Sequence, residues 1–544
     1  MKLNAKKLGW WIFWILPVLY FILYAGSGFS TNDPGFVPAL SYRILSGEHS
    51  GLDFIYVRPP LTPYLHALEM ALLPEEGQVY GMRLVYYLMM AVGVWWGVKS
   101  LAKHLDLAEL GLQPAWLAVT ALVFSYHNYP AMPWHTVDGV FFTMAGLFAL
   151  THSRKTGGIV LGLVLFALAA FCKQPFALMP VGAVLLSMLL HGFHPTLRAT
   201  VISVLLANLG LALLWFFVPN GAEWISLNLE AVRGASGSSD LMQAGIMVYK
   251  PAVVFGLPYL LLFVLGRVFP SVPFRGWLVF GAVMLGILTW LVFIVAYVNQ
   301  EQIYLPPRYG FFHLLLLISL CTSMWMATDL SFRKGMAVLG FLGVASWAAG
   351  ISWGYSFPAQ IALPGIAGTM MFAGVLHDFK PPKWTLPLLA MAGFISFHFV
   401  QQYPYMERHR SELTYHAGDV FPELAHIYTH RGQYDMLMDF KQLQKRIGPD
   451  FVVLPGLPPA HYLTHTQAVI PLDWEHDGEM GYEKGVARVV AVMEESKPPV
   501  LVEKDMKSEA YSANRNYRCS VLAHVLENWQ ITDSTAYFEV YQAR

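Results

Sequence analysis

The sequence predicts a polytopic α-helical membrane protein followed by a soluble α/β domain at its C-terminal end. Composition is the first indication: 56% of the 544 residues are hydrophobic and only 13% are charged, whereas soluble chains have about 25% charged residues. The distribution of charge is the second, because residues 402–544 hold 34 of the 70 charged side chains. Two environments therefore share the chain, and we place the domain boundary near Gln401.

Thirteen apolar stretches in residues 1–401 are long enough to be membrane spans. A helix needs about 20 residues to cross a hydrocarbon layer of about 30 Å, and fewer where flanking side chains reach the interface. The first stretch is rich in aromatic residues and lacks a small-residue cleavage site, so we interpret it as a span and not as a signal peptide. The predicted spans are residues 10–28, 81–98, 111–127, 138–152, 157–172, 175–191, 199–218, 250–266, 276–298, 309–328, 335–353, 360–377 and 384–401.

The orientation follows from the preference of Lys and Arg for cytoplasmic loops. With the N-terminus inside, inner segments hold 14 of the 21 basic residues before position 402, and outer loops hold 11 of the 15 acidic ones. An odd number of spans then places the C-terminal domain outside. The inner loops are short, whereas residues 29–80 and 219–249 form long outer loops. We therefore expect the function on the outer face.

Charge and cysteine content exclude some classes of protein. The formal net charge is zero, which disfavours a nucleic-acid partner, because such binding depends on clustered Lys and Arg. The three cysteines, Cys172, Cys321 and Cys519, are far apart in the sequence and give no disulfide framework or Cys-x-x-Cys metal site.

Asp33 is the first candidate catalytic residue. It follows the first span by a few residues, where a carboxylate is partly removed from water but can still be reached from an aqueous cleft. Such a group suits a general base. Asp33 could equally cap a short helix that begins at Pro34, and the local sequence leaves both interpretations open.

Several short motifs lie in a fixed order on the predicted outer face. They are Asp33, Asp53-Phe54, Arg58-Pro59-Pro60-Leu61, Arg83, Asp138-Gly139, Lys173-Gln174-Pro175 and Pro307-Arg308-Tyr309. In this order they resemble the GT-C superfamily of polytopic glycosyltransferases, in particular the branch with the aminoarabinose transferase of lipid A and the protein O-mannosyltransferases. The resemblance implies a GT-C fold in a bacterial inner (plasma) membrane, with a cytoplasmic N-terminus and a periplasmic C-terminal domain.

The resemblance also implies an activity. It is the inverting transfer of a sugar from a polyprenyl (undecaprenyl) phosphate to a periplasmic acceptor such as a lipid-linked glycan, lipid A or a protein. Asp33 would be the base. Cations suit the departing phosphate, so its binding falls to Arg58, Lys173, Arg308 and the neighbouring Tyr309. Asp53, Asp138 and Arg83 would support the site or the acceptor.

Structural roles compete with several of these assignments. Arg58 and Arg308 could anchor the chain at lipid headgroups, Asp53 could bind loop amides, and Asp138 could be a helix N-cap. No cofactor is required, and we predict no metal site. Asp33, Asp53 and Glu48 could gather around a divalent cation, but their spacing does not demand one, and the Trp-Trp-Asp-Tyr-Gly signature of metal-dependent oligosaccharyltransferases is absent.

The two remaining outer segments have expected supporting roles. Gly and Ser residues at 234–238 suit a lid over the substrate or a merely mobile loop. In the C-terminal domain, strands near residues 451–454, 499–502 and 536–541 alternate with helices at about 482–496 and 514–528. We expect this domain to cover the outer cleft and help to select the acceptor. We interpret its histidines 409, 416, 426 and 430 as solvated.

The rival prediction is a transporter or flippase for a lipid-linked glycan, which also needs many spans in contact with membrane lipids and a few buried charges. Transporters often contain internal repeats with broken helices in corresponding positions, and the sequence shows no such repeat. A flippase also has no evident use for an outer α/β domain.

Overall fold

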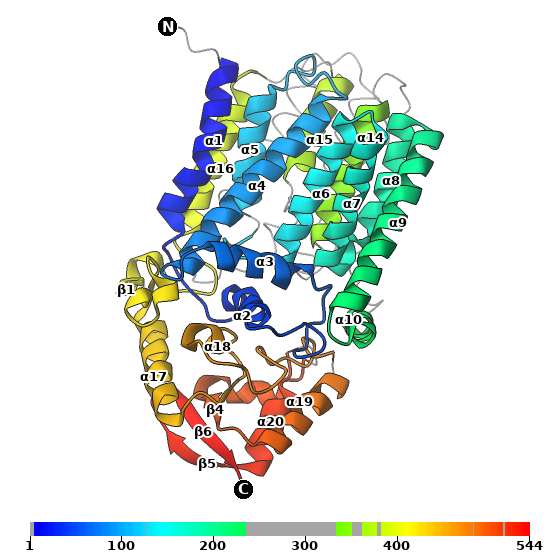
Figure 1. Ribbon diagram of the computed structural model, residues 1–544. Coiled ribbons are helices and arrows are strands. Elements are labelled where there is room, and N and C mark those ends of the chain that lie inside the picture. Colours follow the sequence, from blue (N-terminus) through cyan, green and yellow to red (C-terminus); the bar gives the residue numbers. More distant parts are fainter. Residues whose placement is uncertain are drawn as a thin grey trace.

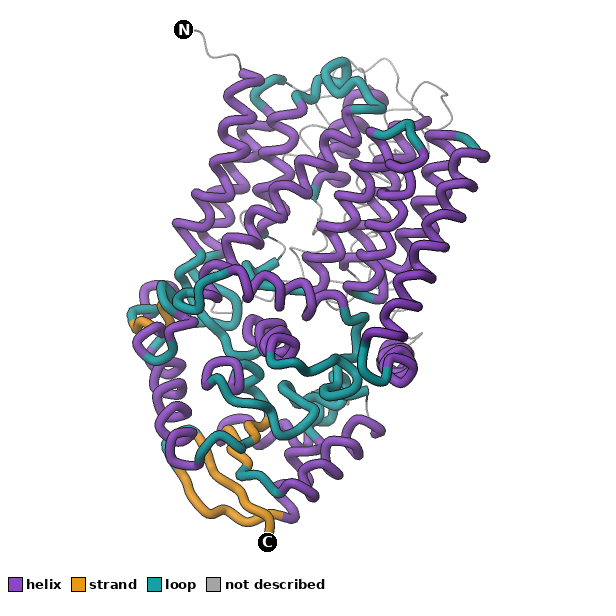
Figure 2. Tube along the Cα trace, viewed as in Figure 1, coloured by secondary structure: helices purple, strands orange, loops and turns teal. Residues whose placement is uncertain are grey.

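The computed structural model describes residues 5–127, 129–235, 333–350, 362–377, 382–481, 483–514 and 517–544. These residues are mostly helical. A long helical bundle lies at one end of the molecule and a four-stranded sheet with its covering helices at the other (Figure 1). Loops and short helices fill much of the junction between the two parts (Figure 2).

The bundle contains ten described helices, and each overlaps one of the predicted spans. They are α1 (Ala5–Tyr24), α4 (Gln78–Ala102), α5 (Pro114–Tyr126), α6 (His135–His152), α7 (Thr156–Cys172), α8 (Leu178–His191), α9 (Phe193–Phe217), α14 (Arg333–Gly350), α15 (Leu363–His377) and α16 (Thr385–Val400). The predicted spans 250–266, 276–298 and 309–328 lie outside the described residues.

Four segments in the described part of the chain are long and apolar enough to cross a membrane. They are Lys7–Tyr24, Gln78–Ala102, Gln174–His191 and Phe193–Phe217, and α5, α7 and α16 are shorter apolar helices. Phe13, Tyr20 and Tyr24 of α1 are buried. The Tyr20 ring lies 4.6 Å from that of Tyr126 and 4.7 Å from that of Phe397, centroid to centroid. This cluster joins α1, α5 and α16.

Three helices lie at the junction between the bundle and the C-terminal region (Figure 1): α2 (Asp33–Leu45), α3 (Leu61–Leu72) and α10 (Gly221–Ala235). The first two belong to the first predicted outer loop, and α10 forms the start of the second. Asn228 of α10 is buried, and its side-chain amide donates to the Ser50 carbonyl oxygen over 3.1 Å. The rest of the predicted lid, residues 236–249, lies outside the described residues.

The C-terminal region is built around a sheet of order β3-β4-β6-β5, in which β3 and β4 are parallel and the other neighbours antiparallel. Val453 and Leu501 pack on the same side as α17, whereas Val452 and Val500 pack with α19 and α20. The sheet therefore lies between two helical layers. Its elements are α17 (Arg431–Ile447), β3 (Val452–Leu454), α19 (Glu483–Ser496), β4 (Val500–Glu503), α20 (Ser520–Asn528), β5 (Trp529–Ser534) and β6 (Phe538–Ala543).

Short elements complete the described chain. A small antiparallel pair joins β1 to β2. The remaining elements are η1 (Gln174–Ala177), η2 (Arg410–Glu412), β1 (Tyr415–His416), η3 (Ala417–Asp419), η4 (Pro422–Leu424), β2 (Tyr428–Thr429), α18 (Ala460–Thr464) and η5 (Lys504–Tyr511).

One hydrophobic core crosses the junction. The buried residues of α17, such as Leu437 and Phe440, belong to the same cluster as Phe29, Met70 and Met82 from the first loop, α3 and α4. Burial of such apolar surface contributes roughly 25 cal/mol per Å² to stability. The C-terminal region is therefore packed against the bundle and not merely tethered to it.

Candidate functional site

Asp33 is the first residue of α2, and it lies where α2 meets the chain that follows α16. The N-cap position belongs to Asn32, which makes no side-chain capping bond, so the capping interpretation of Asp33 is wrong. Instead the Asp33 Oδ2 atom accepts a hydrogen bond from the Tyr405 hydroxyl. Burial raises the pKa of the Asp33 carboxyl to about 6, although the bond from Tyr405 and the Arg58 charge oppose the rise. Asp33 is therefore a carboxylate that titrates just below neutral pH.

Arg58 lies close enough to Asp33 to influence its pKa, in the extended segment that leads into α3. Its guanidinium holds the carboxylate of Glu479 through both terminal nitrogens, and the Nη2 to Oε1 distance is 2.6 Å. The two side chains are only 16% and 19% exposed. The guanidinium also lies 5.8 Å from the centroid of the Phe36 ring and 5.9 Å from that of Tyr56. Arg58 is thus fixed inside the junction and does not extend freely as a headgroup anchor would.

Lys173 occupies the turn between α7 and η1 and is 2% exposed. Its Nζ donates to the Thr136 hydroxyl over 2.7 Å. An ammonium group has three donors, and this is the one bond that the described residues provide. Burial lowers the pKa of Lys173, the Arg58 charge lowers it further, and the charge of Glu479 acts in the opposite sense. Lys173, Arg58 and Glu479 therefore form one electrostatic group.

Sequence reasoning missed Glu479, which comes from the C-terminal region. The one available signal was an unusual acidic run, because Asp473, Glu475, Asp477 and Glu479 alternate with other residues over seven positions. The group has another buried neighbour, His135, whose Nδ1 has no hydrogen-bond partner among the described residues. Burial lowers the pKa of His135, and the charges of Arg58 and Lys173 lower it further.

Asp138 lies on α6, four residues beyond the N-cap position held by Trp134, so the N-cap interpretation is wrong here as well. Its carboxylate accepts a 2.8 Å bond from the Thr62 hydroxyl and contacts His66 Nε2 at 3.2 Å. Burial alone would lower the pKa of His66, but the charges and hydrogen bonds of Asp138 and Glu69 outweigh it and raise that pKa to about 10. Asp138 therefore balances a charged histidine and links α6 to α3.

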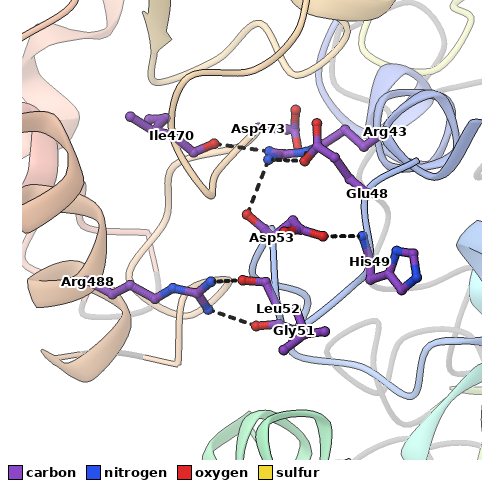
Figure 3. A network of polar contacts seen from close by, with 9 residues as sticks. All are labelled: Arg43, Glu48, His49, Gly51, Leu52, Asp53, Ile470, Asp473 and Arg488. Atoms are coloured by element: carbon purple, nitrogen blue, oxygen red, sulfur yellow. Dashed lines mark hydrogen bonds and ion pairs between the residues drawn. The ribbon is translucent and has the colours of Figure 1, made fainter. Parts of the chain in front are cut away.

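The side chains of Arg83 and Asp53 form hydrogen bonds with backbone groups. Arg83 is buried in α4 and donates to the carbonyl oxygens of Ala25 and, over 2.6 Å, Gly28, so it holds the turn that leads from α1 toward Asp33. The Asp53 carboxylate accepts a 2.7 Å bond from the His49 amide (Figure 3), as the loop interpretation of Asp53 predicted. The third carboxylate of the hypothetical cation site, Glu48, instead accepts from Arg43 Nε over 2.7 Å.

Arg43 and Arg488 fasten the first loop to the C-terminal region (Figure 3). Arg43, in the last turn of α2, lies 3.1 Å from Asp473 and also donates to the Ile470 carbonyl oxygen. Arg488 of α19 donates to the carbonyl oxygens of Gly51 and Leu52. Asp33 is the first residue of α2 and Arg43 lies in its last turn. These contacts therefore fix the direction of α2 and with it the position of Asp33.

We expect Arg43→Met to lower the free energy of unfolding by about 3 to 5 kcal/mol, because it leaves the buried Asp473 without its cation. Chemical unfolding of the detergent-solubilised protein, followed by tryptophan fluorescence, measures the loss. The matched control is Arg431→Met. Arg431 and Asp435 form an exposed pair, with side chains 77% and 43% exposed, and such pairs contribute at most about 1 kcal/mol. Equal losses of stability in the two variants would contradict the role of Arg43 in fastening the first loop to the C-terminal region.

The structure thus brings together Asp33, Arg58 and Lys173, and it places Asp138, Asp53 and Arg83 in contacts that hold the surrounding chain. Arg308 and Tyr309 lie outside the described residues. The arrangement places the Asp33 carboxyl near the buried guanidinium of Arg58 and the buried amine of Lys173, which suits a proton transfer next to a bound anion. Comparison of the chain with protein-family models, with curated proteins and with solved structures gives no match.

Proposed function

We propose that this chain is an inverting glycosyltransferase that moves a sugar from a polyprenyl phosphate to an acceptor on the outer face of a bacterial inner membrane. The proposal includes thirteen spans, a cytoplasmic N-terminus and a periplasmic C-terminal domain. The observation that carries it is the convergence of Asp33 and Arg58, from the first outer loop, with Lys173, from the turn between α7 and η1, at one buried place in the junction.

The charges suit the leaving group of this reaction. When the bond between the anomeric carbon and the phosphate oxygen breaks, the electron pair stays on the oxygen, and the phosphodiester becomes a phosphomonoester dianion. Arg58 can hold two phosphate oxygens at once, and Lys173 adds a second positive charge with donors to spare. Charge-stabilising donors in such a poorly hydrated place are typically worth about 3 to 4 kcal/mol each in the transition state.

Asp33 suits the other half of the reaction. A general base is most effective when its pKa lies near the working pH, and the pKa of Asp33 is about 6. Asp33 takes the proton from an acceptor hydroxyl or amine while the acceptor atom attacks the anomeric carbon from the side opposite the phosphate. A single displacement of this kind inverts the anomeric configuration.

Glu479 accepts hydrogen bonds from both terminal nitrogens of Arg58. Because an incoming phosphate presents the same two-oxygen edge as a carboxylate, it would compete for the same guanidinium nitrogens. In this proposal the C-terminal region therefore takes part in donor binding through Glu479.

The pH dependence of transfer gives one prediction. Since the base must be deprotonated, kcat/KM should fall as the pH drops through about 6, the pKa of Asp33. The hydrogen bond from Tyr405 lowers that pKa, so Tyr405→Phe should raise it and move the acidic limb to higher pH. The measurement is kcat/KM between pH 4.5 and 9. Tyr511→Phe, at a tyrosine that is 63% exposed, is the control. An acidic limb that stays in place in Tyr405→Phe would argue against Asp33 as the titrating group.

The proposed activity is tested with the purified protein in liposomes. A panel of radiolabelled polyprenyl-phosphate sugars is added together with an extract of membrane lipids and glycans. Transfer moves the label from the polyprenyl phosphate to an acceptor, with inverted configuration at the anomeric carbon. If the label crosses the bilayer on its original carrier and no donor in the panel is consumed, the proposal fails and the transport hypothesis is supported.

A further inference from the structure

Three side chains from separate segments converge at the edge of the junction, away from the proposed catalytic group. Glu75 lies between α3 and α4, Glu423 lies in η4, and His465 follows α18. Each offers one metal-ligating atom, and these atoms all lie within 4.8 Å of one another. His465 Nε2 is 2.6 Å from Glu423 Oε1 and 3.3 Å from Glu75 Oε1.

Glu423 differs from an ordinary surface carboxylate. It is 0% exposed, whereas the side chains of Glu75 and His465 are 63% and 47% exposed. Its second oxygen, Oε2, is buried and has no hydrogen-bond partner among the described residues. Buried carboxylates are normally paired and hydrogen-bonded or bound to a metal. The contact of Oε1 with one imidazole nitrogen therefore leaves Oε2 free to bind a further cationic group.

His465 is the C-cap residue of α18, and its φ of 51° is the left-handed conformation in which helices commonly end. Its Nε2 atom lies between the carboxylates of Glu75 and Glu423.

We propose that Glu75, Glu423 and His465 bind a zinc ion that fastens the α3–α4 connection to the C-terminal region. One imidazole nitrogen and two carboxylate oxygens are common zinc ligands, whereas Ca²⁺ and Mg²⁺ prefer oxygen alone. Ligand atoms at about 2.1 Å from a tetrahedral zinc lie about 3.4 Å from one another. The distance between His465 and Glu75 already matches this value, and the pair His465 and Glu423 must open by less than 1 Å to reach it.

The fourth ligand of this zinc is water, because two of the three protein ligands are partly exposed. The ligands come from both sides of the junction, so metal binding favours the docked arrangement over the separated one. Without a metal the same three groups form only a contact of the His465 imidazole with the two carboxylates. The two interpretations differ in whether the protein binds zinc with a saturable, stoichiometric affinity.

The test uses the full-length, tag-free protein in detergent, stripped with a chelator and then titrated with Zn²⁺ alone by calorimetry. We expect one equivalent to bind with a micromolar or tighter dissociation constant. Glu423→Gln and His465→Gln should each weaken binding at least 100-fold, and Glu75→Gln at least 10-fold. His524→Gln is the matched control, because His524 contacts a single carboxylate, that of Glu494, over 2.7 Å, and it should bind zinc like the wild type.

Thermal unfolding distinguishes the loss of a zinc ligand from a general folding defect. Glu75 is largely exposed, so Glu75→Gln should fold like the wild type and unfold at the same temperature without metal. Added zinc should raise the unfolding temperature of the wild type and of His524→Gln, and raise that of Glu75→Gln much less. Absence of saturable zinc binding by the wild type, or wild-type affinity in all three ligand variants, would overturn the proposal.

Discussion

Asp33→Asn should reduce sugar transfer by about 10²- to 10⁴-fold in kcat/KM, the usual contribution of a general base. The amide has nearly the same shape and can still contact Tyr405, so the substitution removes proton acceptance with little change in packing. Because the buried Asp33 carboxyl has a pKa of about 6, it is mostly ionised at pH 7.5 in the wild type. Initial rates of label transfer at that pH, with donor and acceptor varied separately, measure the loss.

Two variants make the result specific for Asp33. Asp33→Glu keeps a carboxylate but moves it by one methylene, and we expect an intermediate rate. Asp419→Asn removes an exposed carboxylate that contacts His416, and its rate should equal that of the wild type. If Asp33→Asn retains more than a third of the wild-type kcat/KM while remaining folded, Asp33 is not the base.

Removing Arg58 should reduce transfer by about 10²- to 10³-fold, as expected for loss of a donor to the developing phosphate charge. The single variant is ambiguous, since Arg58→Met leaves Glu479 buried and without a cation, which is itself destabilising. Glu479→Gln removes this problem. We therefore expect Glu479→Gln to retain activity and Arg58→Met in the Glu479→Gln background to lose it.

The pair of variants separates two roles of Arg58. If Arg58 binds the donor phosphate, the double variant is far slower than Glu479→Gln, and the KM for the donor rises. If Arg58 serves only to hold Glu479, Glu479→Gln alone is as slow as the double variant. Thermal unfolding of both proteins, measured beside the kinetics, verifies that they are folded.

The helical bundle could be predicted because its signal is local. A run of about 20 apolar residues favours a membrane-spanning helix, and each predicted span that falls on described residues overlaps a helix. The strands β3, β4 and β6 were also predicted from a local signal, because each contains a short apolar run. By contrast, β5 was missed because Gln530, Thr532 and Asp533 make it polar; only Trp529 in it is buried, and pairing with β6 holds the strand in place.

The site was predictable only in part, because the partner of a charged side chain is set by tertiary structure. Local sequence could not distinguish Asp33 as a base from Asp33 as a cap. The hydroxyl that donates to the Asp33 carboxylate belongs to Tyr405, more than 370 residues away. The partner of Arg58 is Glu479, more than 420 residues away. No periodicity in the sequence relates positions at such separations.

The hydrophobic core that crosses the junction also constrains how the chain folds as it is synthesised. Phe29, Met70 and Met82 are completed early, but their partners Leu437, Phe440 and Phe538 emerge last. At about 5 to 20 residues per second, the first loop waits roughly 20 to 90 s with this apolar surface uncovered. Nascent chains that end near Gln401 should therefore expose the first loop to proteases or chaperones, and the loop becomes protected only once β6 has been made.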